Sequence, residues 1–538
     1  MKRFWLVMLS LGLVLAFSAS AMAVDVKFSG SFYAAGMYLD KTSFNKDDIA
    51  PAYIYGTAHV LSSMGGTSTG ANMSTYSGFS TYTGSMGTGA MATLHSMAVL
   101  GTFGHSANMS TFGDMSSAQK AGNSTAFYYQ RLRLQTDFIV SPGLKLVTRF
   151  DAMDRIWGGM RSAVTDTVTN SAGTRAENEN IAFDWAYIYY TSPIGLFEVG
   201  YMADNGWGTN FGNNAINGAP IGAISYTVPI GPFYINAKVG KNADYSRSAV
   251  NPGELTTDSD DDSYSIGVIY VPNKDIQVGF LGAYKRIAGT RIAYGDAAYL
   301  YPFEANAYAY SANPYFKVKV GPVALEGELN YVFGQVNYES TYYPEIGPYV
   351  AGQKGDVSNL TVYLNALADF GMFYGGATFA YVSGDDSVNT PTNKMEGGFI
   401  DGGVDFQPCL IMFNAERNYR VGGLNGYGGI TDIGRYYTSN SNVLSNAWFL
   451  QGKAGVRPIA PLDIMASVSW AAADQKNGAV SADYGWEVDV TGTYKLTNNL
   501  SYMLGVGYLF TGDYYKGNSN ANAVNNNYIL INKLTLTF

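Results

Sequence analysis

The chain ends with NNNYILINKLTLTF, residues 525–538, an alternating run that stops at an aromatic residue. In an extended strand, residues two apart share a face, so alternation separates apolar from polar side chains. The apolar face would hold Tyr528, Leu530, Leu534, Leu536 and Phe538, and the polar face Lys533, Thr535 and Thr537. The run predicts a half-buried C-terminal strand. Whether it belongs to a soluble sheet or to a membrane barrel depends on the rest of the chain.

The same alternation recurs along the chain, and the connections between the alternating segments are of two kinds. One kind is a tight turn of Pro, Gly, Asn or Asp, such as SPGL at residue 141 and LTNNL at residue 496, whereas the other is long and polar. Short turns at one end and long loops at the other are typical of transmembrane β-barrels. We expect eighteen strands, starting near Val24, Ala126, Leu144, Ile181, Leu196, Pro220, Phe233, Ser263, Ile276, Asn306, Val323, Val357, Met372, Asn446, Leu462, Tyr484, Asn499 and Asn526.

Residues 1–23 have the pattern of a cleaved signal peptide. Lys2 and Arg3 precede an apolar stretch that ends in Ala21-Met22-Ala23, a small-residue cleavage site. No later apolar run is long enough to predict a membrane helix. The net charge of −9 argues against nucleic acid as a partner, and the single cysteine, Cys409, excludes an intramolecular disulfide. We therefore expect one barrel over residues 24–538, located in the outer membrane of a Gram-negative bacterium.

Aromatic residues are abundant, with 43 Tyr and 28 Phe, and they gather where strands should leave a bilayer. Such belts place amphipathic rings at the headgroups. On the loop side we expect Trp157, Trp207, Tyr342, Tyr343, Tyr436 and Tyr437, and on the turn side Phe138, Phe233 and Phe370. In this setting Phe538 ends the closing strand and is the terminal signal for the barrel-assembly machinery.

Several stretches then carry a family resemblance. They are YYQRLRLQTDF (128–138), FDWAYIYYTSPIGLFEVGYMADNGWG (183–208), YGWEVDVTGTYKLTNNLSYMLGVGYLFTGDYYK (484–516) and NKLTLTF (532–538). Together they resemble the outer-membrane porins of sulfate- and metal-reducing Gram-negative bacteria, which are similar to the alginate-export barrel family. The resemblance covers most of residues 126–538 but not 41–125. It implies a large barrel with a solute-conducting lumen, and it carries no catalytic motif.

An eighteen-stranded barrel is wide enough for an aqueous channel, so charged residues on its inner face are the candidate functional residues. The basic candidates are Arg131, Arg133, Lys145, Arg149, Lys317, Lys319, Lys453 and Arg457. The acidic candidates are Asp151, Asp184, Glu198, Glu326, Glu328, Glu487 and Asp489. Facing rows of charge set ion selectivity. The alternative is that these charges neutralise one another in a plugged lumen.

Two long loops are expected, one over residues 41–125 and one over 385–445. The first is rich in Ser, Gly and Met and contains an imperfect duplication, ANMSTY at residue 71 and ANMSTF at residue 107. It also holds all three histidines, His59, His95 and His105. Imidazole and thioether groups suit a soft metal, but their spacing defines no ligand set. We expect this loop to fold into the barrel mouth, with a disordered or adhesive surface loop as the alternative.

The second loop and an acidic run supply further candidates. Glu416, Arg417, Arg420 and Arg435 are the candidates for lining a constriction. The run TTDSDDDSY, residues 256–264, makes Asp258, Asp260, Asp261 and Asp262 a weak calcium candidate. Its spacing does not fit an EF-hand loop, and solvated carboxylates are the alternative, so we expect no metal.

The function predicted from the sequence is an outer-membrane porin for passive diffusion of small hydrophilic solutes or ions. No GxSxG, HExxH or Walker motif is present and no histidine lies on an expected strand, so we expect neither an enzyme nor a cofactor. The expected partners are outer-membrane lipid, the assembly machinery and the solutes, and a homo-oligomer is left open. The rival functions are a substrate-specific channel or polysaccharide exporter of the alginate-export type, and a structural or adhesive barrel with a blocked lumen.

Overall fold

The computed structural model describes residues 24–41, 44, 124–157, 182–203, 206–212, 220–244, 260–288, 303–341, 354–384, 394–396, 405–414, 416–417, 444, 446–476, 479–517 and 519–538. The predicted signal peptide, the histidines of the first loop, Asp258, Arg420, Arg435, Tyr342, Tyr343, Tyr436 and Tyr437 lie outside these ranges. Within them, no helix has the length and apolar character needed to cross a membrane.

One sheet contains the strands of the described residues, and its pairings are antiparallel except that of β14 with β12. The first ten are β1 (Asp25–Leu39), β2 (Thr125–Ser141), β3 (Leu144–Ile156), β4 (Ala182–Ser192), β5 (Gly195–Ala203), β6 (Pro220–Ile230), β7 (Phe233–Ala243), β8 (Asp261–Asn273), β9 (Ile276–Ile287) and β10 (Phe303–Val320). The others are β11 (Val323–Thr341), β12 (Lys354–Asp369), β13 (Phe373–Val382), β14 (Lys394–Met395), β15 (Ala447–Ile459), β16 (Leu462–Ala473), β17 (Asp483–Lys495), β18 (Leu500–Thr511) and β19 (Asn527–Thr537), with the 3-10 turn η5 (Asp513–Lys516) after β18.

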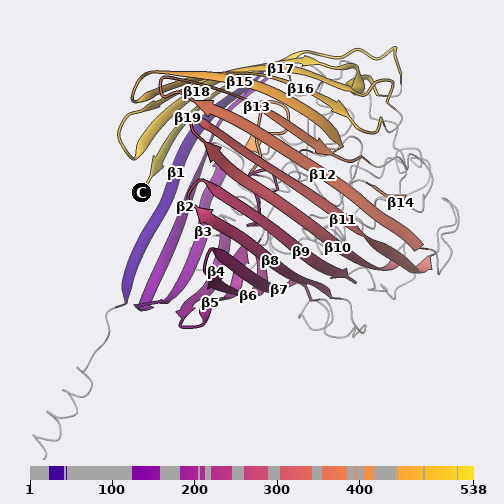
Figure 1. The fold of residues 1–538 in the computed structure, drawn as a ribbon. Coiled ribbons are helices and arrows are strands. Elements are labelled where there is room, and N and C mark those ends of the chain that lie inside the picture. Colours follow the sequence, from indigo (N-terminus) through magenta and orange to yellow (C-terminus); the bar gives the residue numbers. More distant parts are fainter. Residues whose placement is uncertain are drawn as a thin grey trace, which may run out of the picture.

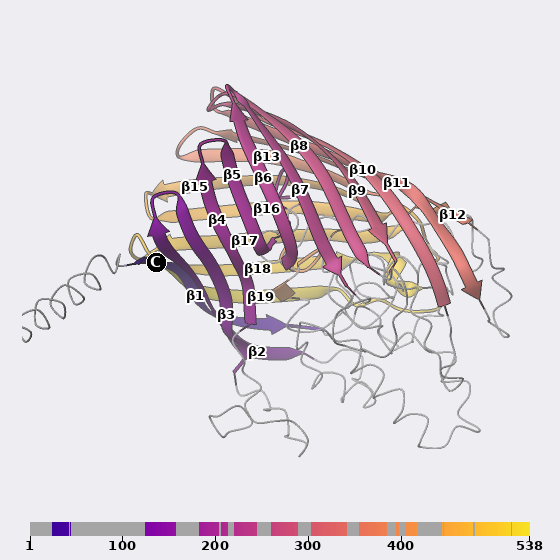
Figure 2. The same cartoon turned by 90° about the horizontal axis from the view of Figure 1, so that it is seen from below.

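The sheet closes on itself into a barrel (Figure 1, Figure 2). Each long strand pairs with its neighbours in sequence, and β19 returns to pair with β1 from Ser31–Thr537 to Leu39–Ile529. Phe538 seals this seam, since its backbone N–H donates to the Gly30 carbonyl at 3.0 Å and its carbonyl accepts the Gly30 N–H at 2.8 Å. The two-residue β14 lies beside β12, while β13 pairs directly with β15. The wall of the described barrel therefore consists of eighteen strands, here called staves, and this confirms the predicted fold.

The strand starts agree with the sequence prediction to within three residues, and the eight short turns lie where predicted. The largest differences are at β10, which starts at Phe303 instead of near Asn306, and at β12, which starts at Lys354 instead of near Val357. Glycine provides the positive φ angle that a tight turn needs, with values of 82° at Gly143 and 58° at Gly321. Local turn chemistry thus sets the strand register at this end.

The outer wall is apolar, whereas the inner wall carries the buried polar and charged side chains together with buried apolar clusters. Each of the eighteen staves carries at least one exposed large apolar side chain. On β11, outward Leu325 and Leu329 are 40% and 37% exposed, whereas inward Glu328 and Asn330 are each 5% exposed. A soluble sheet would bury its apolar face, whereas a transmembrane barrel presents it to lipid, and this barrel has the second arrangement.

The aromatic belts follow the prediction at most described positions. Trp157 is outward and 50% exposed, and its ring stacks on Tyr128 with centroids 5.5 Å apart. Phe233 and Phe370 are exposed beside short turns. The prediction for Trp207 is wrong, because its ring lies edge-on to Tyr315 inside the barrel.

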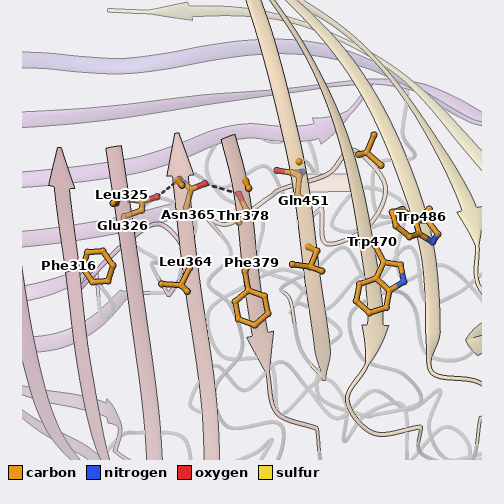
Figure 3. A pocket seen from close by; sticks show the side chains of 15 residues that line it. Phe316, Leu325, Glu326, Leu364, Asn365, Thr378, Phe379, Gln451, Trp470 and Trp486 are labelled. Carbon is orange, nitrogen blue, oxygen red and sulfur yellow. Dashed lines mark hydrogen bonds between the residues drawn. The ribbon is translucent and has the colours of Figure 1, made fainter. Parts of the chain in front are cut away.

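The outer wall between β10 and β17 contains an apolar groove of about 720 Å³. Aromatic and aliphatic side chains of neighbouring strands line it, among them Phe316, Leu364, Phe379, Trp470 and Trp486 (Figure 3). The same strands turn polar groups the other way, where Asn365 Nδ2 donates to Glu326 and Thr378 Oγ1 donates to Asn365. The groove therefore belongs to the apolar exterior, and the polar chemistry lies in the lumen.

Candidate functional site: the barrel lumen

Residues 206–212, here called the first inserted segment, leave the barrel wall between β5 and β6 and enter the lumen. The indole N–H of Trp207 donates to the Asn313 carbonyl on β10 at 2.9 Å. The backbone N–H and hydroxyl of Thr209 both donate to Glu328 on β11, at 2.6 and 2.7 Å. Since β5 and β11 are six staves apart, the segment reaches these partners through the barrel interior.

Residues 405–414 with 416 and 417, here called the second inserted segment, come from the connection between β13 and β15 and lie against the inner wall. The backbone N–H groups of Ile411 and Met412 donate to Glu487 on β17 at 2.6 and 2.7 Å. The backbone N–H of Leu410 donates to Asp489 at 3.3 Å. Buried backbone donors need partners, and carboxylates on the wall supply them.

The two segments meet inside the barrel. Phe211 stacks on Tyr363 of β12 with centroids 5.1 Å apart, and it lies edge-on to Phe406 at 5.3 Å. Phe211 is completely buried and Phe406 is 8% exposed. Within the described chain, the contacts of the two segments narrow the lumen by placing the segments against the inner faces of β10, β11, β12, β17 and β19.

The predicted basic ladder of β2 and β3 is present, but carboxylates neutralise it. Arg133 makes two bonds to Asp151, Nε–Oδ1 and Nη2–Oδ2, both 2.6 Å. Arg149 Nε lies 3.0 Å from Asp184, and its guanidinium stacks 3.5 Å above the Trp185 ring. These contacts therefore fix the orientation of the guanidinium groups. The row of charged side chains that β2, β3 and β4 direct into the lumen contains both positive and negative groups.

Asp137 is a member of this row that the sequence analysis did not single out. Its Oδ2 lies 2.6 Å from Lys145 Nζ, and Gln135 also donates to it. On β2, Asp137 shares the inward face with Arg133 and Gln135, because residues two and four apart on a strand point to the same side. This alternation could have identified Asp137 from the sequence. Glu198 on β5 lies opposite Tyr189 in the register and is half-buried.

Lys317, Glu326 and Arg457 have local partners. Lys317 and Glu326 are register partners, as expected, but Lys317 lies over the Tyr315 ring while Glu326 accepts from Tyr363 and Asn365. Near the turns, Arg457 bridges Asp369 and Asp463 at 3.0 and 3.1 Å. Two further predicted lining residues are the exposed Lys319 and the half-buried Lys453.

Glu328, Glu487 and Asp489 face inward as the alternation predicts, but the inserted segments cover them. They are 5%, 0% and 3% exposed. Period-2 alternation identifies the face of a strand, but it contains no information on what lies against that face. We therefore revise their role from lining an open passage to anchoring the inserted segments.

Two of the four constriction candidates are described. Glu416 accepts from Lys533 on β19 at 2.9 and 3.1 Å. Burial by itself raises the pKa of Glu416, but Lys533, with smaller contributions from Tyr33 and Arg131, outweighs burial and holds this pKa below its ordinary value. Arg417 is completely buried, its Nε donates to the Ile411 carbonyl, and burial lowers its pKa to about 10. Arg417 thus packs within the segment instead of lining a constriction.

The described carboxylates of the acidic run do not form a group that could hold a metal ion. Asp260 and Asp262 both pair with Lys241, at 2.6 and 3.0 Å. Asp261 is buried and accepts the backbone N–H of Ala288. The structure therefore gives no support to the weak calcium candidate at these three residues.

Comparison with known proteins gives a likeness at the level of architecture. No protein-family model matches the chain, and no curated protein matches it. Solved structures that match include the outer membrane channel DcaP of Acinetobacter baumannii, at 10% identity and a TM-score of 0.37 over 96% of this chain and 99% of that chain. OpdK of Pseudomonas aeruginosa matches at 12% identity and 0.42 over 95% and 99%, and OpdQ of the same organism at 9% and 0.41 over 95% and 98%. At these scores the fold assignment rests on the strand pairings of the chain itself.

Proposed function

We propose that the protein is an outer-membrane porin that lets small hydrophilic solutes or ions diffuse passively through its lumen. The observation that carries the proposal is the inside-out distribution of side chains around a closed barrel. Every stave presents apolar groups outward, whereas arginine, lysine and carboxylate groups point inward. Closing the barrel pairs the backbone groups of its first and last strands. A sheet can cross a bilayer only when no such backbone edge is left exposed to lipid.

The passage runs along the inner face of β2 to β7 in this proposal. The inserted segments occupy the opposite side, against β10 to β19, through Glu328, Glu487 and Lys533. The passage is then lined by the Arg133–Asp151 and Arg149–Asp184 pairs and by Lys145 with Asp137. Because the charges alternate in sign, we expect weak ion selectivity and passage of small polar solutes.

Several further properties belong to the same proposal. The chain acts in the outer membrane of a Gram-negative bacterium, after removal of residues 1–23. It needs no cofactor and catalyses no reaction. Phe538 closes the seam with Gly30 and also serves as the signal for the assembly machinery. Kinship with the porins of sulfate- and metal-reducing bacteria, and more distantly with alginate exporters, is part of the proposal too.

A planar bilayer recording of the refolded barrel tests this function. We expect steady, ohmic steps, and a salt gradient should give a reversal potential close to zero because the lumen charges are mixed. Correct folding is checked beforehand by the heat-dependent gel mobility of barrels. A folded barrel that gives no steps would refute the porin function.

The contact between the two inserted segments favours a second candidate, a barrel with a blocked lumen that serves a structural or adhesive role. Its support is the buried cluster of Phe211, Tyr363 and Phe406, which holds the segments together at mid-strand height. The recording separates the two candidates, since a blocked barrel stays silent in the wild type. A variant that disconnects the segments would then conduct.

A further inference from the structure

Three potential metal ligands meet where the second inserted segment lies on β17. The Cys409 sulfur and one carboxylate oxygen each of Glu487 and Asp489 all lie within 4.8 Å of one another. The side chains are 3%, 0% and 3% exposed. Glu487 and Asp489 are two apart on one strand and so share a face, and Cys409 approaches from the segment. No other such group of three occurs in the part of the chain that the structure describes.

The charge at this place is not balanced by an ion pair. Among the described residues, neither Glu487 nor Asp489 forms a salt bridge, and each takes backbone N–H donors from the segment. The positive charge of Arg417 is attracted by the Glu487 carboxylate. Two buried carboxylates side by side repel each other unless a proton or a cation lies between them.

One oxygen of the cluster lacks a partner. Asp489 Oδ1 is buried without a hydrogen-bond donor among the described residues, while Oδ2 accepts the Leu410 N–H. Buried polar atoms are nearly always satisfied, so an orphaned carboxylate oxygen points to a missing proton donor or cation. The two N–H bonds to Glu487 also fix the orientation of its carboxylate, as outer partners of metal ligands do.

We propose that Cys409, Glu487 and Asp489 form a binding site for a divalent cation of the Zn²⁺ type. Thiolate and carboxylate oxygen are both accepted by Zn²⁺, and three protein ligands leave a fourth position for water. A thiolate favours Zn²⁺ over the harder Ca²⁺ and Mg²⁺. A dication would offset two of the three negative charges that the ligands carry.

The bound cation would link the second inserted segment to the barrel wall. Thiolate ligands must be deprotonated, so binding would release the thiol proton of Cys409. The cation would hold Cys409 to Glu487 and Asp489, adding to the three backbone hydrogen bonds between the segment and β17. This inference concerns how the segment is held and goes beyond solute passage.

The test uses the full refolded chain in detergent, exposed to ZnCl₂ and then dialysed, with Co²⁺ as a spectroscopic substitute. We expect about one Zn²⁺ per chain and, with Co²⁺, a thiolate-to-metal charge-transfer band with intense tetrahedral ligand-field bands. Cys409→Ser should abolish the charge-transfer band. Asp489→Asn should weaken Zn²⁺ binding by about 100-fold or more, since even outer-shell partners contribute about 10- to 100-fold. Asp463→Asn, a matched change beside Arg457, should leave both readouts unchanged.

Heat-dependent gel mobility verifies that each variant is folded, and the wild-type spectrum is decisive even if a variant does not fold. Absence of Zn²⁺ after dialysis of the wild type would overturn the proposal, as would Co²⁺ binding without a thiolate band. Equal Zn²⁺ affinity in wild type and Asp489→Asn would overturn it too, and would leave a shared proton as the explanation of the carboxylate pair. Conductance of the same preparation separates the proposals, because an open pore without Zn²⁺ refutes only the metal site.

Discussion

Ion pairs between neighbouring staves decide which charges a solute would meet in the lumen. Arg133 and Arg149 alternate with Asp151 and Asp184, and the Arg133 Nη2 atom also lies 3.4 Å from Asp184. A guanidinium with two carboxylate bonds is held in one geometry, because its planar fork matches the carboxylate. A single neutral substitution should therefore change the local field with little change in shape.

Asp151→Asn removes one negative charge from this row and leaves Arg133 without its bidentate partner. We expect the reversal potential in a salt gradient to shift towards anion selectivity, because the row then carries one more positive than negative charge relative to the wild type and attracts anions into the passage. The measurement is single-channel recording under a KCl gradient. Asp513→Asn is the control, since it removes the same charge from a carboxylate that is 53% exposed after β18. An equal shift in both variants would contradict a passage along β2 to β4.

Glu416 makes the docking of the second inserted segment sensitive to acid. Its pKa is held below the ordinary value, so the Lys533 pair stabilises docking above a pH of about 4.3 and is lost as pH falls through the lower native pKa. We expect conductance to rise as the pH falls below the ordinary pKa of a glutamate, because the segment loosens. Glu416→Gln should conduct more at pH 7 and lack this acid step. An acid step that persists in Glu416→Gln would assign it to another carboxylate.

At the scale of elements, strands hold the inserted segments through backbone hydrogen bonds to inward carboxylates, and aromatic packing joins the segments to each other. Phe211 is the central contact, since it touches both Tyr363 on the wall and Phe406 of the second segment. Its removal should separate the segments without altering any stave.

Phe211→Ala should lower the stability of the segment contact by about 3 to 5 kcal/mol, the usual effect of removing a buried phenylalanine ring. We expect larger and noisier single-channel steps, because the segments would no longer hold each other in the lumen. Phe183→Ala is the matched control, since this ring is 63% exposed on the outer wall of β4. Unchanged conductance in Phe211→Ala would show that the segment contact does not limit the passage.

The strands could be predicted from the sequence and the inserted segments could not, for a physical reason. Alternation and turn residues are local, so strand starts, the eight turns and inward Arg133 or Glu487 follow from neighbours in the chain. The contact of Thr209 with Glu328 joins residues 119 apart in sequence, and no local pattern encodes it. The outer-belt prediction for Trp207 failed for the same reason, because an aromatic residue near a strand end can turn to either side.

For the whole molecule, adjacent residues of one strand face lipid and lumen in turn, so they should tolerate a charge very differently. Two neighbouring positions of β4 test this. Ile188 is outward and 50% exposed, whereas Tyr187 points inward and its nearby charges include Glu198 and Asp137. Arginine on a lipid-facing position near the bilayer midplane destabilises a barrel by about 2 to 4 kcal/mol, whereas lumen positions tolerate charge. We therefore expect Ile188→Arg to lower the urea midpoint of unfolding in lipid vesicles. Tyr187 packs against Met202, Ile221 and Ala223, but it faces the lumen, so Tyr187→Arg should unfold at a higher urea concentration than Ile188→Arg and shift selectivity towards anions. If both variants unfolded at the same urea concentration, the outer wall of β4 would not face lipid, and the transmembrane orientation of the barrel would have to be abandoned.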